Sequence, residues 1–232
     1  MKKAISVMLV LVSLFGICAC RKQPEPIRIP VEIEMPDYSG LSDIDFSDVE
    51  FRYPDTEAVP MTFGSYEDDI YSNAYIGMAC ELGDAWEVEV FPLEEGEDPF
   101  VGVGDDVPVS VMQCRRLSDG VSIMIKYLQA PANTTQEELE GIVYSQEQMD
   151  ATAAAFEVRG AENVTMEEKT VVFCGETVKM LCTKLVLAGV EVCQYSYHCM
   201  TGSDVFVQIM LMGETEEEAD ALAGLFYSYS EE

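Results

Sequence analysis

The feature that most constrains the fold is a series of three long alternating segments near the C-terminus. Residues 177–187, 190–200 and 203–212 each alternate in polarity or carry apolar side chains on both faces, and short turns separate them at Ala188-Gly189 and Gly202-Ser203. A period of two is typical of β-strands, and two-residue turns join antiparallel neighbours. The last segment is apolar on both faces, which predicts a central strand that is covered on two sides.

Four more strands are predicted in two hairpins, at residues 74–82, 85–91, 107–117 and 121–128. The first hairpin is expected to turn at Gly83-Asp84 and the second at Asp119-Gly120, because Asp-Gly is a strong signal for a type I′ turn. A two-residue turn in the second hairpin places Cys114 opposite Ile125.

Two helices are marked by capping boxes, in which a threonine is followed three residues later by a glutamate: Thr135 with Glu138, and Thr215 with Glu218. The first helix is expected to run to about residue 154, with the apolar residues Leu139, Ile142, Val143 and Met149. The second is expected to bury Ala219, Leu222, Ala223 and Phe226. Strand meanders interrupted by two main helices predict a single antiparallel α+β domain over residues 63–232.

The N-terminus has the organisation of a secretory leader. Lys2 and Lys3 precede an apolar run at residues 4–17, which is shorter than the roughly 20 residues of a membrane span. The sequence Ile17-Cys18-Ala19-Cys20 resembles the bacterial lipobox, with Cys18 as a departure from its second position. The resemblance implies a signal peptide at 1–19 and a diacylglyceryl group on Cys20. Acyl chains on Cys20 would anchor the protein to the outer face of the cell membrane.

Residues 20–62 are predicted to form an extended acidic tether. They contain the prolines Pro24, Pro26, Pro30, Pro36, Pro54 and Pro60. Proline at this density excludes helix and central strand, so the segment would hold the domain away from the membrane.

The chain is strongly acidic, with a formal net charge of −30. Removal of Lys2 and Lys3 with the leader would make it −32. Such a surface repels the phosphates of nucleic acids, which excludes nucleic-acid binding. The charge is typical of a strongly solvated surface, and it also suits the binding of cations.

Histidine is the commonest catalytic base, and the chain has only one, His198. The predicted register places His198 opposite Lys179 and beside Val207, as a structural residue on a strand. The sequence has no nucleophile elbow, zinc-protease motif or complete phosphate-binding glycine loop. These patterns predict a protein without catalysis and without a cofactor.

Six cysteines follow the leader: Cys80, Cys114, Cys174, Cys182, Cys193 and Cys199. An even number in an exported chain suggests disulfides. Cys182 and Cys193 share a sheet face at diagonal positions, roughly 7–8 Å apart, which makes them a candidate pair near the limit for a bridge. The alternative is that the cysteines are small apolar side chains that fill the core.

Acidic residues gather in segments rich in glycine and proline. Asp98, Asp105 and Asp106 in one long loop are candidate ligands for calcium, although such runs are usually solvated loops. Two carboxyl groups across a cleft could also hydrolyse a glycosidic bond, but the sequence does not show their separation.

Three short motifs resemble those of small clostridial-type (Gram-positive) surface lipoproteins of unknown function. They are Tyr71-Ser72-Asn73 followed by Gly77, Trp86 after a short turn, and Phe173-Cys174-Gly175-Glu176 before a long hairpin. The resemblance covers residues 66–230 and implies a PsbP-like fold, an antiparallel sheet with helices on both sides. It implies no reaction and no catalytic or binding residue.

The sequence therefore predicts a membrane-tethered extracytoplasmic lipoprotein that is a non-catalytic binding or interaction module. Its partner would be an envelope protein or a small ligand. The alternative is a small hydrolase that acts on the cell envelope through carboxylates. A solute-binding protein is a third reading, but the domain is short for two lobes.

Overall fold

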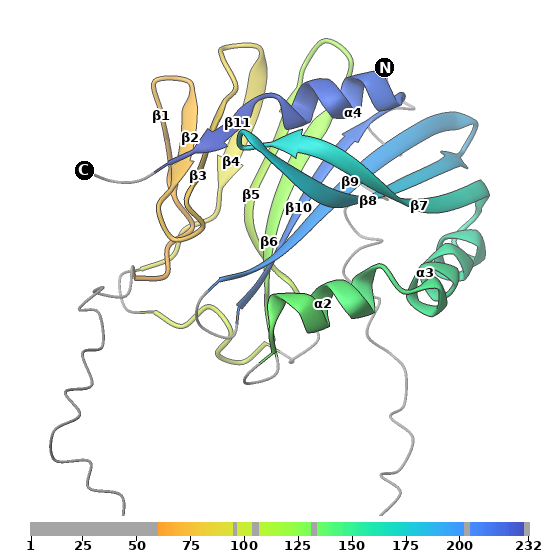
Figure 1. The fold of residues 1–232 in the computed structure, drawn as a ribbon. Helices are drawn as coiled ribbons and strands as arrows, with labels where there is room; N and C mark the ends of the chain where they lie inside the picture. The colour runs from red at the N-terminus through yellow and green to blue at the C-terminus, as the bar shows by residue number, and fades with distance from the viewer. Residues whose placement is uncertain (1–59, 95–96, 104–106, 131–133, 202–204, 230–232) are drawn as a thin grey trace, which may run out of the picture. The chain divides into compact units, whose positions relative to one another are not determined.

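A computed structural model of the protein describes residues 60–94, 97–103, 107–130, 134–201 and 205–229 (Figure 1). The predicted signal peptide, the lipidation site Cys20 and nearly all of the tether lie outside these residues, as do Asp105 and Asp106. What the sequence predicts for them stays a prediction.

The larger of two sheets has seven antiparallel strands. Their order across the sheet is β4 (Trp86–Val90), β5 (Val109–Arg116), β6 (Ser122–Gln129), β10 (Val205–Gly213), β9 (Val190–Thr201), β8 (Glu176–Leu187) and β7 (Ala161–Phe173). The strand predicted to be central, β10, lies in the middle of this sheet, between β6 and β9.

Both faces of β10 are buried, as its apolar pattern predicts. On one face, Val207, Ile209 and Leu211 belong to the main core, which includes residues of helix α4 (Glu216–Ala223). On the other face, Met210 and Met212 pack with Met124 of β6. Each of these side chains is at most 5% exposed, which confirms the reading of the last strand.

The smaller sheet has the order β1 (Ser65–Glu67), β2 (Ile70–Asn73), β3 (Met78–Glu81) and β11 (Phe226–Ser228). The hairpin predicted around Gly83-Asp84 is wrong, because β3 and β4 belong to different sheets. Leu82 and Gly83 instead donate backbone hydrogen bonds to the carbonyl of Asp69. The turn therefore carries the chain from one sheet to the other, and β3 pairs with β2 and with β11 from the C-terminus.

Three helices accompany the sheets: α2 (Gln136–Val143), α3 (Gln146–Val158) and α4. Both predicted capping boxes are present, at Thr135 and Thr215. The helix expected to run to residue 154 is interrupted, because the Ser145 side chain accepts a hydrogen bond from the Gln148 amide and starts a second helix. Figure 1 shows α4 and the α2–α3 pair at opposite ends of the larger sheet.

The β5–β6 hairpin has a longer turn than predicted. Arg116 donates its backbone N–H to the carbonyl of Val121, which leaves four residues in the loop, and Cys114 lies opposite Ile123 rather than Ile125. A shift of two residues keeps the same side chains on the same face. The core positions of this hairpin were therefore predicted correctly although the register was not.

The β8–β9 hairpin follows the prediction, but the next turn does not. Ala188 and Gly189 both have positive φ, as a type I′ turn requires, and Cys182 lies opposite Tyr195. Between β9 and β10, Thr201 pairs with Val205, so the loop is one residue longer than expected. This shift places His198 opposite Gln208 instead of beside Val207.

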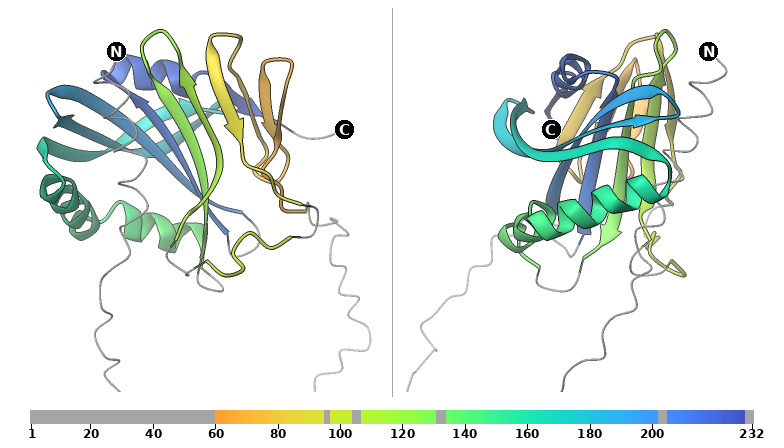
Figure 2. Two further views of the ribbon diagram at one scale, coloured as in Figure 1. Left: turned by 180° about the vertical axis from the view of Figure 1, so that it is seen from behind. Right: turned by 90° about the vertical axis from the view of Figure 1, so that its right-hand side faces the viewer.

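One long strand, β7, was missed from the sequence. It is an edge strand in the larger sheet, and it alternates exposed polar residues with half-buried ones. Its ladder with β8 is irregular near Asn163, which has a positive φ. Charges and a bulge are common on edge strands because they discourage pairing with other chains. Figure 2 shows the β7–β8 hairpin curling away from the rest of the sheet.

Candidate functional site

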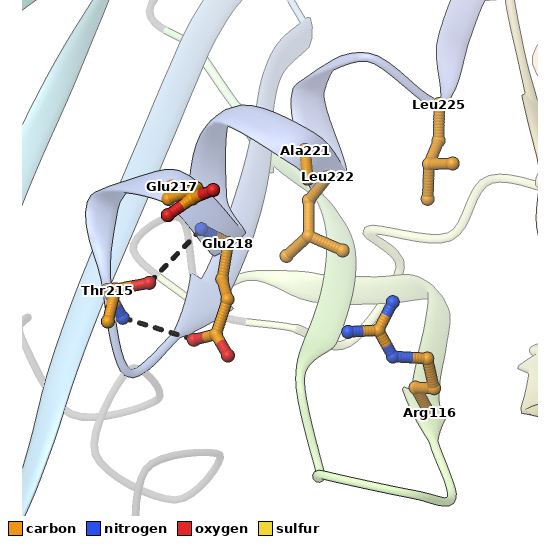
Figure 3. Close-up of a pocket in the computed structure, with 7 residues that line it drawn as sticks. All are labelled: Arg116, Thr215, Glu217, Glu218, Ala221, Leu222 and Leu225. Carbon is orange, nitrogen blue, oxygen red and sulfur yellow. Dashed lines mark hydrogen bonds between the residues drawn. The ribbon is translucent and has the colours of Figure 1, made fainter.

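A hollow that is open to solvent lies beside α4, among the described residues (Figure 3). Its volume is about 470 Å³. The lining residues come from the end of β5 and from the segment around α4: Arg116, Thr215, Glu217, Glu218, Ala221, Leu222 and Leu225. We call this hollow the α4 groove. None of its residues was predicted as a site, although the capping box at one end was recognised.

The α4 helix is fixed at its start by the capping box. The Thr215 side chain accepts a hydrogen bond from the Glu218 amide at 3.2 Å, and the Glu218 carboxylate accepts the amides of Glu214 at 2.7 Å and Thr215 at 3.1 Å. Glu218 therefore serves to hold the helix terminus. Leu222 faces the core below the helix and is 2% exposed.

Arg116 forms the opposite wall of the α4 groove. Its Nε and Nη2 atoms donate hydrogen bonds to the Asp119 carboxylate at 2.8–3.1 Å, and its guanidinium lies 5.7 Å from the centre of the Trp86 ring. The hydrogen bond from Arg116 lowers the pKa of Asp119. The pair is held in one orientation and its charges largely cancel.

On its other side, α4 is attached to the sheet by ion pairs. Lys169 of β7 lies 2.6 Å from a Glu216 carboxylate oxygen and 3.6 Å from Asp220, and Lys184 of β8 also contacts Glu216. Lys169 donates to the hydroxyl of the buried Tyr195 as well. Burial would lower the pKa of Lys169, but its hydrogen bonds with Glu216 and Tyr195 outweigh that effect and raise it. The cluster is a structural attachment for the helix.

The six cysteines of the described domain are free thiols in the structure. Cys182 and Cys193 lie diagonally across β8 and β9, and a hydrogen bond between their sulfurs lowers the pKa of Cys182 and raises that of Cys193. Four of the six, Cys80, Cys114, Cys182 and Cys193, are buried. The structure thus supports the reading of cysteines as core side chains, and the Cys182–Cys193 bridge stays a prediction.

Thiol labelling of the purified mature protein is expected to be slow in the native state. Burial raises the pKa of Cys174, one of the two more exposed thiols, from 9.0 to about 11. At pH 8 this reduces its thiolate fraction, and hence its labelling rate, by about 100-fold relative to an ordinary cysteine. A chromogenic disulfide reagent measures the rate, and rapid labelling of Cys174 would contradict the structure. After denaturation without reductant, six titrating thiols would exclude the Cys182–Cys193 bridge, whereas four would show one disulfide, and peptide mapping would then test whether it joins Cys182 to Cys193.

His198 is sealed inside the domain between α2 and the sheet. Its ring stacks on Phe206 at 5.5 Å between centroids and meets the edge of Tyr144 at 6.3 Å. Gln208 donates a hydrogen bond from its side-chain amide to Nε2 at 3.3 Å, whereas Nδ1 has no hydrogen-bond partner. Burial lowers the pKa of His198 to about 4. The ring is therefore a neutral core residue, which agrees with the structural role predicted for it.

In the acidic segments that the structure describes, the aspartates have structural roles in turns. Asp68 and Asp69 have positive φ in the β1–β2 turn, and the Asp98 carboxylate accepts the backbone amide of Phe100 at 2.9 Å. Among the described residues, no three His, Cys, Asp or Glu side chains gather to hold a metal ion. Calcium binding by Asp98 with Asp105 and Asp106 remains a prediction, because the last two lie outside the described residues.

The motif residues of the clostridial-type resemblance have structural roles. Tyr71 is fully buried and donates its hydroxyl to the carbonyl of Phe63 at 2.8 Å. The Asn73 side-chain amide donates to the hydroxyls of Tyr71 at 3.0 Å and Tyr127 at 2.9 Å. Tyr127 in turn donates to the carbonyl of Thr62 at 3.0 Å. This network joins the start of the domain to β6 in the larger sheet.

Within the part of the chain that the structure describes, no helix has the length and apolar character needed to cross a bilayer.

No family model and no curated protein matches the chain. Among solved structures, the chain is similar to the solution structure of cyanobacterial PsbP (CyanoP) from Synechocystis sp. PCC 6803, at 13% sequence identity and a TM-score of 0.43. The similarity covers 69% of this chain and 91% of that chain. The α+β class of the domain rests on its own strands and helices.

Proposed function

We propose that the protein is a lipid-anchored extracytoplasmic lipoprotein whose folded domain is a non-catalytic binding module. The leader and Cys20 support the anchor, and the α4 groove supports the binding module. The observation that carries the proposal is that the charged side chains of the groove are held in place by hydrogen bonds. Glu218 is engaged in capping α4 and Arg116 is paired with Asp119, so both form a fixed surface.

The groove is open to solvent and its walls combine charge with apolar surface, as at the rim of protein interfaces. A catalytic base or nucleophile needs a pKa matched to its task. Burial lowers the pKa of His198 to about 4 and raises that of Cys114 to about 12, so these side chains are suited to packing. A binding role for the groove agrees with both observations.

Anchoring is tested by the mass of the intact protein extracted from membranes. We expect a chain that begins at Cys20 and carries acyl groups, because two acyl chains give stable membrane attachment where one does not. The Cys20→Ser variant should lose the acyl mass and leave the membrane fraction. A mature chain that begins elsewhere would refute the anchor without affecting the binding proposal.

Binding is tested by a photo-crosslinking side chain placed in the groove of the anchored protein in living cells. Ala221 is exposed and lines the groove, so a crosslinker there should give a discrete adduct with an envelope component. The matched control is Ala151, an exposed alanine on α3. Adducts of equal yield and identical pattern from the two positions would refute a binding site at the groove.

A further inference from the structure

The carboxylates of α4 are divided between two sides of the helix. Glu216 and Asp220 are four residues apart, so they share one side, and both contact Lys169. Glu217 and Ala221 are also four residues apart, and they line the α4 groove on the other side (Figure 3). The charges of Glu216 and Asp220 are thus balanced by lysines, whereas the groove side presents Glu217 and Glu218.

The groove also has an apolar wall. Leu225, which is half-buried, lines it after the end of α4, and Arg116 closes it from below, whereas Leu222 belongs to the core beneath the groove (Figure 3). The positive charge of Arg116 is balanced by Asp119, which binds it through two oxygens. The remaining charge of the groove is therefore negative, on a chain whose net charge is already −30. A complementary ligand must combine positive charge with an aliphatic group.

We propose that the α4 groove binds an extended basic segment of a partner protein, with an aliphatic side chain against Leu225 and an adjacent Lys or Arg at Glu217. This inference rests on the proposed binding function and names the chemistry of its partner. The guanidinium of Arg116 has Nη1 outside its bonds to Asp119 and faces the groove, where it can donate to a backbone carbonyl of the segment. The acidic surface of the domain speeds the encounter with such a segment.

The test uses three synthetic peptides that are blocked at both ends and differ only at alternating positions: Lys with Leu, Lys with Ser, and Glu with Leu. Fluorescence anisotropy with the mature protein should show binding of the Lys–Leu peptide alone, weakening as salt rises. Equal binding of the Lys–Ser peptide would reduce the interaction to general attraction between opposite charges and would overturn the proposal.

Two groove variants locate the binding. Glu217→Gln is expected to weaken binding of the Lys–Leu peptide roughly threefold, because it removes one exposed ion pair. Ala221→Lys, on an exposed helical position, should weaken it roughly tenfold by repelling the basic segment. The matched controls are Glu147→Gln and Ala151→Lys, which change the same residue types at the same spacing on α3 and should leave affinity unchanged.

Equal losses in the α3 controls would overturn the assignment to the groove. Failure of the basic-segment proposal can be distinguished from failure of the binding function itself. A discrete crosslink from position 221 without peptide binding would keep the module and refute the basic partner. Absence of both would refute the two proposals together.

Discussion

Replacing Gly64 with alanine is expected to lower the free energy of unfolding by about 2–4 kcal/mol, a large share of the stability of a single domain. A Cβ atom at this position would lie 2.3 Å from the carbonyl oxygen of Ser72 and 2.9 Å from the Cβ of Asn73. The backbone φ of +79° adds roughly 1 kcal/mol of strain for a residue other than glycine. Urea unfolding measures the change, with Trp86, the only tryptophan, as the fluorescent probe.

The matched control is Gly189→Ala in the β8–β9 turn. Gly189 has nearly the same φ, +78°, but no atom lies within 4 Å of the added Cβ. The Gly189→Ala variant should therefore lose only about 1 kcal/mol of unfolding free energy, from the backbone strain of the positive φ. Similar losses in the two variants would show that contact with the Ser72–Asn73 backbone contributes nothing, and would contradict the packing of Gly64 against β2.

The residues that Gly64 packs against show why local motifs are easier to recognise in the sequence than the structural roles of their residues. The Tyr71–Asn73 motif was visible in the sequence, but its function depends on Tyr127, which is more than fifty residues away. Capping boxes and the Ala188-Gly189 turn were predicted correctly because their hydrogen bonds lie within a few residues. The edge strand β7 was missed because exposed polar residues make up much of it and its half-buried positions include polar side chains, so it lacks the apolar alternation of the other strands.

Errors in register came from loop length. One extra residue between β9 and β10 moved His198 to the face that it shares with Gln208, and two extra residues in the β5–β6 turn changed partners without changing faces. The division of strands into two sheets depends on β11, which returns from the C-terminus to pair with β3. No local pattern in the sequence predicts a contact between segments so far apart in the chain.

The α4 groove could not be predicted for the same reason. Arg116 looks like the last residue of a strand, and Leu225 looks like the end of a helix. They meet only because β5 and β10, the strand that precedes α4, belong to one sheet. The capping box of α4 is visible in the sequence, but the division of the helix's carboxylates into paired and groove-facing ones requires the positions of Lys169 and Lys184.

The domain is expected to lose stability in mild acid because of His198. An ordinary histidine has a pKa of 6.5, and burial lowers that of His198 to about 4. Between these values the unfolded chain binds the proton more readily than the folded one, so stability falls as the pH decreases. The contribution is complete above pH 6.5 and disappears below pH 4, and the difference corresponds to about 3 kcal/mol. Urea unfolding should therefore give a free energy of unfolding that is about 2 kcal/mol lower at pH 5 than at pH 7.5 because of His198.

The comparison that isolates the histidine is His198→Leu, which keeps an apolar side chain of similar size beside Phe206. Carboxylates also weaken the fold in acid, among them Glu216, whose pKa is lowered to about 2 by its hydrogen bonds from Lys169 and Lys184. These groups are the same in both proteins, so they cancel in the difference. The variant should therefore lose about 2 kcal/mol less than the wild type between pH 7.5 and pH 5. Parallel losses would mean that the imidazole accepts its proton within the folded domain, and that the space between α2 and the sheet admits the charge which the structure excludes.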